Sequence, residues 1–322
     1  MNNTLEKRSL SDILQKYGAL FTLILVVLAL ATISPDFRTM DNFMKLLRQA
    51  SVNGLIAFGM TAVILTGGID LSVGSTLAVS SLVCAMMMKA GIDPIVSMIA
   101  ALALGVGLGC ISGVLVTKGR LQPFIATLIT MTVYRGLTLI LSGGKPVSNL
   151  IAAGDTGASA AVFSGFGKGM LWEIPVPVII FAICFVIFLF VLSRTVTGRR
   201  IYATGSNEKA ARLAGVNTDS IKLFVYAISG MFAAIGGLVI LSRLGSAQPT
   251  AGQGYELDAI AAVALGGTSM SGGRGTLYGT LIGVLIIAVL NNGLNILDVS
   301  SYYQDVVKGV VILLAVLADR KR

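Results

Sequence analysis

Long apolar runs separated by short polar stretches dominate the hydrophobic pattern of this chain. A helix that crosses a bilayer needs about 20 mostly apolar residues, because every backbone N–H and C=O must be bonded within the segment. About ten such runs occur, at residues 17–34, 51–66, 69–88, 94–117, 121–141, 174–193, 221–241, 257–270, 276–292 and 302–317. A basic amphipathic stretch at 42–49 precedes the second run. The pattern predicts an all-α integral membrane protein with about ten transmembrane helices in a single domain over residues 1–322.

Two glycine-interrupted segments occupy similar places in the two parts of the chain. LTGGIDLSVGS at 65–75 and GYELDAIAAVALGG at 254–267 each combine a glycine pair with an aspartate that follows Ile or Leu. Paired interruptions are typical of transporters built from internal repeats, in which the solute path runs between the repeats. We therefore expect two pseudo-repeated halves.

Glycines also recur every four residues in two of the predicted spans. The two series are Gly105, Gly109 and Gly113, and Gly275, Gly279 and Gly283. Small residues at this spacing let helix backbones approach closely, which matters in lipid because no hydrophobic effect drives helices together there. The series predict a tightly packed bundle.

The composition agrees with a membrane protein and excludes several other classes. Hydrophobic residues make up 55% of the chain and charged residues only 12%, against about 25% charged residues in soluble domains. The chain has no histidine, and its three cysteines lie in apolar runs. It therefore lacks the commonest metal ligand and general base, and we expect no cofactor, no metal and no catalytic residue.

The chain also lacks a recognisable device for hydrolysing ATP. The glycine-rich segment GGTSMSGGRGT at 266–276 has no lysine that would reach a nucleotide's phosphates. The segment GFGKG at 165–169 does not match the phosphate-loop pattern either.

The net charge of +9 is explained by membrane topology rather than by nucleic-acid binding. The basic start before the first apolar run is also found in signal peptides, but the run is long and no small-residue cleavage site follows, so we interpret it as a span. An N-terminus inside the cell and an even number of spans place both termini in the cytoplasm. Most Lys and Arg residues then fall in cytoplasmic segments, chiefly in a loop at 194–222, whereas 142–173 forms the main external loop.

A polar segment, NEKAARLAGV at 207–216, lies within that cytoplasmic loop. Asn207 is suited to cap a helix, Glu208 to occupy its electropositive N-terminus, and Gly215 to end it after two turns. Two roles fit such a helix: it lies along the membrane face, or it protrudes as a rigid element that a partner can push.

Five polar residues are candidates for a solute path: Asp70, Ser72, Asp258, Asn291 and Asn292. Acids at membrane depth are functional candidates by default, but capping of the following helix is the interpretation that we favour for each aspartate, and the two roles are compatible. Amides suit a neutral polyol, but they also end helices.

Two basic residues complete the charges at membrane depth. We expect Arg135 to reach toward the membrane interface, and Lys308 to pair with Asp305 on its own helix. With so few charges in the spans, a neutral, hydroxyl-rich solute fits better than an ion, whose charge would need compensation.

Several stretches resemble the permease subunits of bacterial ATP-binding-cassette (ABC) importers. GRRIYATGSNEKAARLAGV at 198–216 resembles their cytoplasmic coupling loop, with Glu208, Ala210, Ala211 and Gly215 at the places of a Glu-Ala-Ala…Gly signature. It departs from the signature at Lys209, which separates the acid from the alanines. LTGGIDLSVGS, SAQPTAGQGYELDAIAAVALGGTSMSGG and LNNGLNILDVSSYYQDVVKGVVILLAVL resemble the sugar-permease branch, so the resemblance covers nearly the whole chain.

The resemblance implies a transmembrane permease domain in the cytoplasmic membrane, whose pore is formed with a second copy of the chain. It also implies a cytoplasmic ATPase subunit, an extracytoplasmic sugar-binding protein and a small sugar, ribose or a close pentose, as solute. The segment from Asn207 to Gly215 would be the coupling helix. Two alternatives remain: an ion-coupled symporter that uses Asp70, Asp258 or Lys308, and a membrane protein that does not transport, such as a receptor or scaffold.

Overall fold

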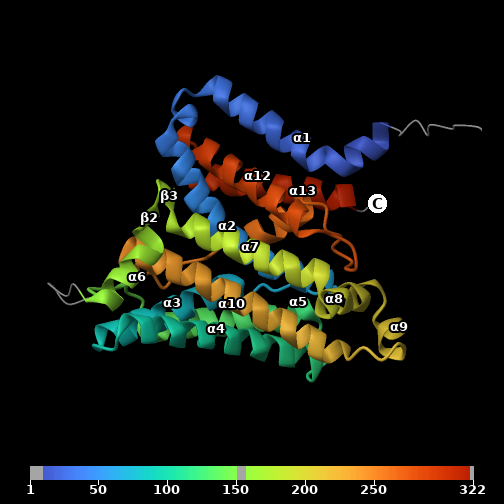
Figure 1. The fold of residues 1–322 in the computed structure, drawn as a ribbon, viewed down its shortest axis with the longest axis horizontal. Coiled ribbons are helices and arrows are strands. Elements are labelled where there is room, and N and C mark those ends of the chain that lie inside the picture. Colours follow the sequence, from blue (N-terminus) through green and yellow to red (C-terminus); the bar gives the residue numbers. More distant parts are fainter. Residues whose placement is uncertain (1–9, 151–156, 320–322) are drawn as a thin grey trace, which may run out of the picture.

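A computed structural model describes residues 10–150 and 157–319 (Figure 1). The longer helices are α1 (Leu10–Ile33), α2 (Met40–Leu65), α3 (Val73–Lys89), α4 (Pro94–Thr117), α5 (Pro123–Ser142), α7 (Val176–Arg194), α10 (Thr218–Leu244), α12 (Leu277–Ile296) and α13 (Ser301–Asp319). The shorter ones are the 3-10 helix η1 (Asp36–Arg38) and α6 (Ala158–Lys168), α8 (Val196–Ser206), α9 (Glu208–Leu213) and α11 (Tyr255–Leu265). Two small antiparallel sheets pair β1 (Val147–Ser148) with β4 (Ser246–Ala247), and β2 (Met170–Leu171) with β3 (Ile174–Pro175).

Helix α2 lies at the centre of the bundle and packs against α7, α10, α11 and α12. The amphipathic stretch at 42–49 and the predicted span at 51–66 form this one continuous helix, which the Thr39 side chain caps by accepting the N–H of Asn42. Every residue from 50 to 65 is buried. Because protein rather than lipid surrounds α2, it accommodates polar residues that a lipid-facing helix would exclude.

The structure supports an all-α membrane protein, but it does not confirm ten spans. Among the described helices, five are long and apolar enough to cross a membrane: α4, α5, α7, α10 and α12. The expected span at 257–270 contains only α11, whose 11 residues rise about 16 Å, roughly half of the hydrocarbon thickness. The predicted span continues to Met270, but Gly267 adopts a φ of +79° and ends the helix after Leu265.

The glycine pairs make matching turns at the ends of α2 and α11. Gly67 and Gly267 each adopt a φ of +79°, directly after the C-cap residue. The next N–H in each turn bonds back five residues, from Gly68 to the Val63 carbonyl and from Thr268 to the Val263 carbonyl. The turn after α2 also contacts the loop that follows the second turn, because the Gly273 N–H donates to the Leu65 carbonyl at 3.0 Å.

The four-residue glycine series pack helices together, as the spacing predicts. The faces of Gly105, Gly109 and Gly113 lie against α10, where an added Cβ would meet Gly230, Tyr226 and Leu223 respectively. Gly279 and Gly283 on α12 lie against Gly266 and Ala262 in the same way. Gly275 precedes α12 with a φ of +152° and lies against Thr268.

Segments that the charge pattern assigns to opposite sides of the membrane lie at opposite ends of the bundle. The start of α1 and the end of α13 lie at the same end as α8 and α9, whereas α6 and the β2–β3 hairpin lie at the other (Figure 1). The expected external loop at 142–173 therefore carries structure of its own, including β1 and α6. Residues 1–9 and 320–322 of the predicted cytoplasmic termini, and 151–156 of that loop, lie outside the described residues.

Candidate functional site

The predicted cytoplasmic loop folds into α8 and α9, which lie at one end of the bundle (Figure 1). Helix α9 is the short helix that the sequence predicts. The Asn207 side chain accepts the Ala210 N–H at 3.0 Å, and Gly215 adopts a φ of +82° just past the last turn. The Val216 N–H donates back to the Ala211 carbonyl at 3.0 Å. These local bonds satisfy both ends of a helix of only six residues.

Glu208 points toward α10 and connects it to α9. Its Oε2 accepts a hydrogen bond from Lys222 Nζ at 2.7 Å, and its Oε1 accepts from Arg212 at 3.0 Å and from Thr218 at 3.2 Å. Arg212 also pairs with Asp219 at 2.6 Å. Partial burial opposes ionisation, but the hydrogen bond and charge of Lys222, together with the bonds from Arg212 and Thr218, outweigh it and lower the pKa of the Glu208 carboxyl. The group is therefore an ionised link between the two helices at neutral pH.

The two faces of α9 differ in what they contact. Ala211 shares the inner face with Glu208 and is only 5% exposed, whereas Ala210 lies on the outer face. Leu213, three residues after Ala210, is 91% exposed. Residues three or four apart share one helix face, so the i, i+3 spacing alone pairs Glu208 with Ala211 and Ala210 with Leu213, but it does not say which pair faces the bundle. The sequence-based site omitted Leu213, the most exposed apolar side chain of the element.

Helix α8 packs directly on the glycine turns of the membrane bundle. A Cβ at Gly205 would collide with the Leu65 carbonyl at the end of α2, and would stand 2.6 Å from the Gly273 N–H. The Tyr202 hydroxyl on the same helix donates to the Gly275 carbonyl at 3.0 Å. The α8–α9 element is thus in contact with the glycine-interrupted segment at 65–75 and with the glycine-rich segment at 266–276.

Asp70 and Ser72 form a closed cluster in the interior. Asp70 is 1% exposed, and its Oδ1 accepts from the Ser72 hydroxyl at 2.6 Å and from the Ser72 N–H at 3.0 Å. Its Oδ2 accepts from the Ser229 hydroxyl of α10 at 2.7 Å. Short bonds to both oxygens hold this carboxylate in the turn before α3. Asp70 therefore has a structural role, because both of its carboxylate oxygens already accept hydrogen bonds and little hydrogen-bonding capacity remains for a solute.

Asp258 lies in a looser cluster between α11, α12 and α13. Lys308 Nζ lies 3.4 Å from its Oδ1, and the Asn291 amide donates to its Oδ2 at 3.4 Å. Both contacts are longer than the 2.9 Å typical of N–H···O bonds. Among the described residues, Asn291 Oδ1 is one of few buried side-chain oxygens without a partner. Lys308 thus contacts Asp258 on α11 rather than the expected Asp305.

Asn292 belongs to a third, separate contact. Its amide donates to Asn42 Oδ1 at 2.8 Å, and the Asn42 amide donates to Asn292 Oδ1 at 3.0 Å. This reciprocal pair ties α12 to α2, and both residues are buried. The five predicted path residues therefore divide into three groups rather than one lining.

Arg135 is bound within the protein instead of reaching toward the interface. Its guanidinium donates to the carbonyls of Pro249 at 2.8 Å and Ala251 at 2.9 Å, in the segment between β4 and α11. A partly buried guanidinium requires acceptors, and these two carbonyls supply them. No local sequence pattern identifies this partner, because more than a hundred residues separate it from Arg135.

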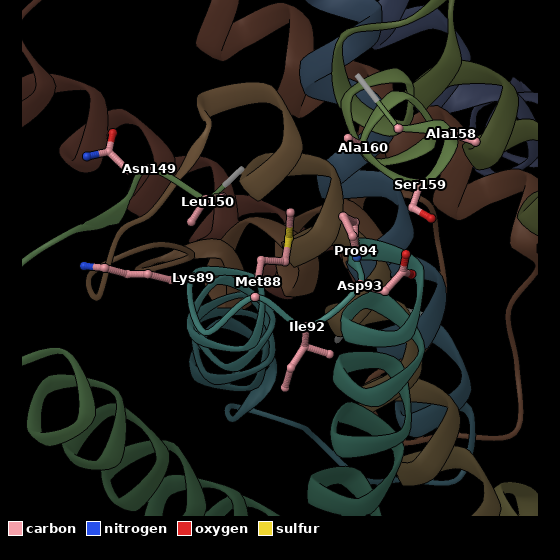
Figure 2. Close-up of a pocket in the computed structure, with 12 residues that line it drawn as sticks. Met88, Lys89, Ile92, Asp93, Pro94, Asn149, Leu150, Ala158, Ser159 and Ala160 are labelled. Atoms are coloured by element: carbon pink, nitrogen blue, oxygen red, sulfur yellow. The ribbon is translucent and has the colours of Figure 1, made fainter. Parts of the chain in front are cut away.

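A cavity of about 570 Å³ lies at the opposite end of the bundle from α9, and Figure 2 shows its lining. Asp93 at the start of α4 and Ser159 of α6 face each other across one side, and Lys89 and Asn149 line another part. A hydrogen bond from Ser159 and N–H groups of the first turn of α4 lower the pKa of the Asp93 carboxyl. Leu150 and Gly157 of the lining flank residues 151–156, which lie outside the described part of the chain.

Known proteins similar to the chain are transport permeases. Residues 42–316 match the family described as the branched-chain amino acid transport system permease component. The ribose import permease protein RbsC of Bacillus subtilis is 53% identical over 310 residues, which cover 96% of this chain and 94% of that protein. Its counterpart in Escherichia coli K12 is 50% identical, over 96% and 95% of the two chains. The D-allose transport system permease protein AlsC of E. coli K12 is 42% identical, over 95% and 91%.

No solved structure matches the chain. The family match covers most of the sequence, and the relatives align over nearly their whole lengths. The fold is consistent with a transport permease, since the bundle contains apolar helices long enough to cross a membrane. The chain belongs to this family of transport-system permease components.

Proposed function

We propose that this protein is the membrane-spanning permease subunit of an ATP-driven importer for ribose. One observation carries the proposal: ribose import permeases are 48–53% identical to the chain over nearly its full length, whereas the D-allose permease is 42% identical. The uncharged, hydroxyl-rich character of ribose also suits a bundle with few charges at membrane depth.

ATP hydrolysis belongs, in this proposal, to a separate cytoplasmic ATPase subunit. The chain has no phosphate-binding loop, and its protruding α8–α9 element supplies a surface on which such a subunit can act. The outer face of α9 is the contact, with Leu213 as its apolar centre and Lys209 and Ala210 beside it. Asn207 and Gly215 cap and end the helix, and Glu208 and Ala211 hold it on the bundle.

The solute path is assigned to the looser of the two aspartate clusters. Asp258 and Asn291 retain hydrogen-bonding capacity, because their contacts are long and one amide oxygen has no partner among the described residues. Asp70 and Ser72 instead fix the turn before α3, and Asn292 fixes α12 to α2. Sugar hydroxyls, which both donate and accept, can bond transiently to a carboxylate and an amide.

Import then proceeds by alternating access in a pair of permeases. A second copy of the chain completes the pore, and the glycine-interrupted segments represent two pseudo-repeated halves. An extracytoplasmic binding protein delivers ribose at the end that carries α6 and the β2–β3 hairpin. Both termini and α8–α9 face the cytoplasm, as the distribution of Lys and Arg indicates.

The test is ribose uptake into proteoliposomes that contain the permease, its ATPase and its binding protein. Uptake should require internal ATP and all three proteins, and should persist when an ionophore dissipates the ion gradients. Uptake that continues without ATP and stops with the ionophore would instead indicate the symporter. If the system transports another sugar but not ribose, the proposal of an ATP-driven importer stands and the assignment of ribose as its solute is rejected.

A further inference from the structure

The contacts of Glu208 lie within the chain. Its carboxylate accepts hydrogen bonds from Lys222 at 2.7 Å, Arg212 at 3.0 Å and Thr218 at 3.2 Å, and two of these three partners belong to α10. The side chain of Lys222 is only 19% exposed and that of Glu208 35%. An acid that met a partner protein directly would have to give up these bonds.

Helix α9 depends on such contacts for its position. It has six residues, and isolated helices shorter than about 12 residues are marginal in water. Its caps close the helix ends but do not determine where the helix lies. Within the described residues, the contacts that orient it are the burial of Ala211, the bonds of Glu208 to Lys222 and Thr218, and the bonds of Arg212 to Thr218 and Asp219.

One face of α10 carries this attachment into the membrane bundle. Lys222, Tyr226 and Ser229 stand at i, i+4 and i+7, and therefore share a face. Lys222 holds Glu208, the Tyr226 hydroxyl donates to the Ile69 carbonyl at 3.3 Å, and Ser229 donates to Asp70 at 2.7 Å. The stripe thus touches α9 at one end and the glycine turn after α2 at the other.

We propose that Glu208 is a positioning residue, which fixes α9 to the Lys222–Tyr226–Ser229 stripe of α10. A displacement of α9 is thereby delivered to the turn that contains Asp70. This inference rests on the proposed function, in which α9 receives the ATPase. It separates the two faces of α9: the inner acid transmits the movement, and the outer face around Leu213 receives it.

A charge exchange tests the proposal in the reconstituted importer. Glu208→Lys and Lys222→Glu should each lower ribose uptake at least tenfold, and the double exchange should restore at least a third of it, because the ion pair re-forms with reversed polarity. Leu213→Asp, on the outer face, should lose the ATPase on co-purification, and no change at position 222 should rescue it. A harmless Lys222→Glu, or a double exchange as inactive as Glu208→Lys, would overturn the proposal.

A distance measurement covers the case in which uptake is lost for another reason. Spin labels on cysteines at Lys209 and Ser220, both exposed, report the separation of α9 and α10 in a background without the native cysteines. The distribution should broaden in Glu208→Lys and narrow again in the exchange variant. An unchanged distribution in Glu208→Lys would show that Glu208 does not position α9. Wild-type protein that fails to import ribose would refute the proposed function while leaving this distance result valid.

Discussion

The close contact of α4 with α10 makes Gly109→Ala a sensitive test of the packing. A Cβ at Gly109 would collide with the backbone carbonyl of Tyr226. A backbone carbonyl within a helix cannot swing aside as a flexible side chain can. The two helices would therefore have to separate locally, which also loosens the contact between Gly105 and Gly230.

The expected magnitude follows from two opposing effects. Overpacking of a well-packed interior costs about 1–3 kcal/mol, whereas replacing a helical glycine by alanine gains about 0.5–1 kcal/mol. Gly107 on the same helix is the matched control, because no atom lies within 4 Å of a Cβ added there. Gly107→Ala carries only the gain, so the two variants should differ by the overpacking cost, about 1–3 kcal/mol.

The assay is thermal unfolding of the purified variants in detergent. Unfolding is monitored as the fraction of protein that remains monodisperse after heating. A change of 1 kcal/mol shifts the melting temperature by about 2–4 °C in domains of 150–250 residues, and by less in longer chains. Gly109→Ala should melt several degrees below Gly107→Ala, and Gly109→Val lower still. A melting temperature of Gly109→Ala equal to or above that of Gly107→Ala would refute the reasoning.

Three further predictions concern the amide pair, the acid of α9 and the topology. Asn292→Leu should destabilise the protein by about 1–3 kcal/mol, because the buried Asn42 amide loses its hydrogen-bond partner on α12. Adding Asn42→Leu should recover part of this loss. A double variant that melts below both single variants would contradict the prediction. Since the pKa of Glu208 is lowered in the folded state, its stabilisation should be complete above about pH 5 and disappear as the pH falls through that lowered value. Melting curves of wild type and Glu208→Gln should therefore converge in acid, and a constant gap would argue against the ion pairs. Cysteines at Ser159 and Ser206 should react with an impermeant reagent only from outside and only from inside respectively, and labelling of Ser206→Cys from outside would reverse the topology.

The sequence by itself determined the elements that depend on neighbouring residues. The run at 94–117 is α4, because apolar helix formers fill it and Asp93 caps it with bonds to the N–H groups of Ile95 and Val96. The cap at Asn207 and the glycine at Gly215 bound α9 in the same local way. Helix ends are visible in the sequence because their bonds join residues within one or two turns. The glycine spacing is visible because it repeats along one helix, although its contacts lie on another helix.

The tertiary structure alone decided which polar residues are occupied and which remain available. Asp70 and Asp258 are alike in sequence context, but Ser229, 159 residues away, closes the coordination of Asp70, whereas Asp258 has only long contacts. Asn42 and Asn292 pair across 250 residues, and α2 accommodates polar groups because other helices bury it from Ala50 onward. Even on α9, the inward turn of Glu208 depends on Lys222 of α10. Such partners come together only when helices pack, since no period of the sequence relates residues on different helices.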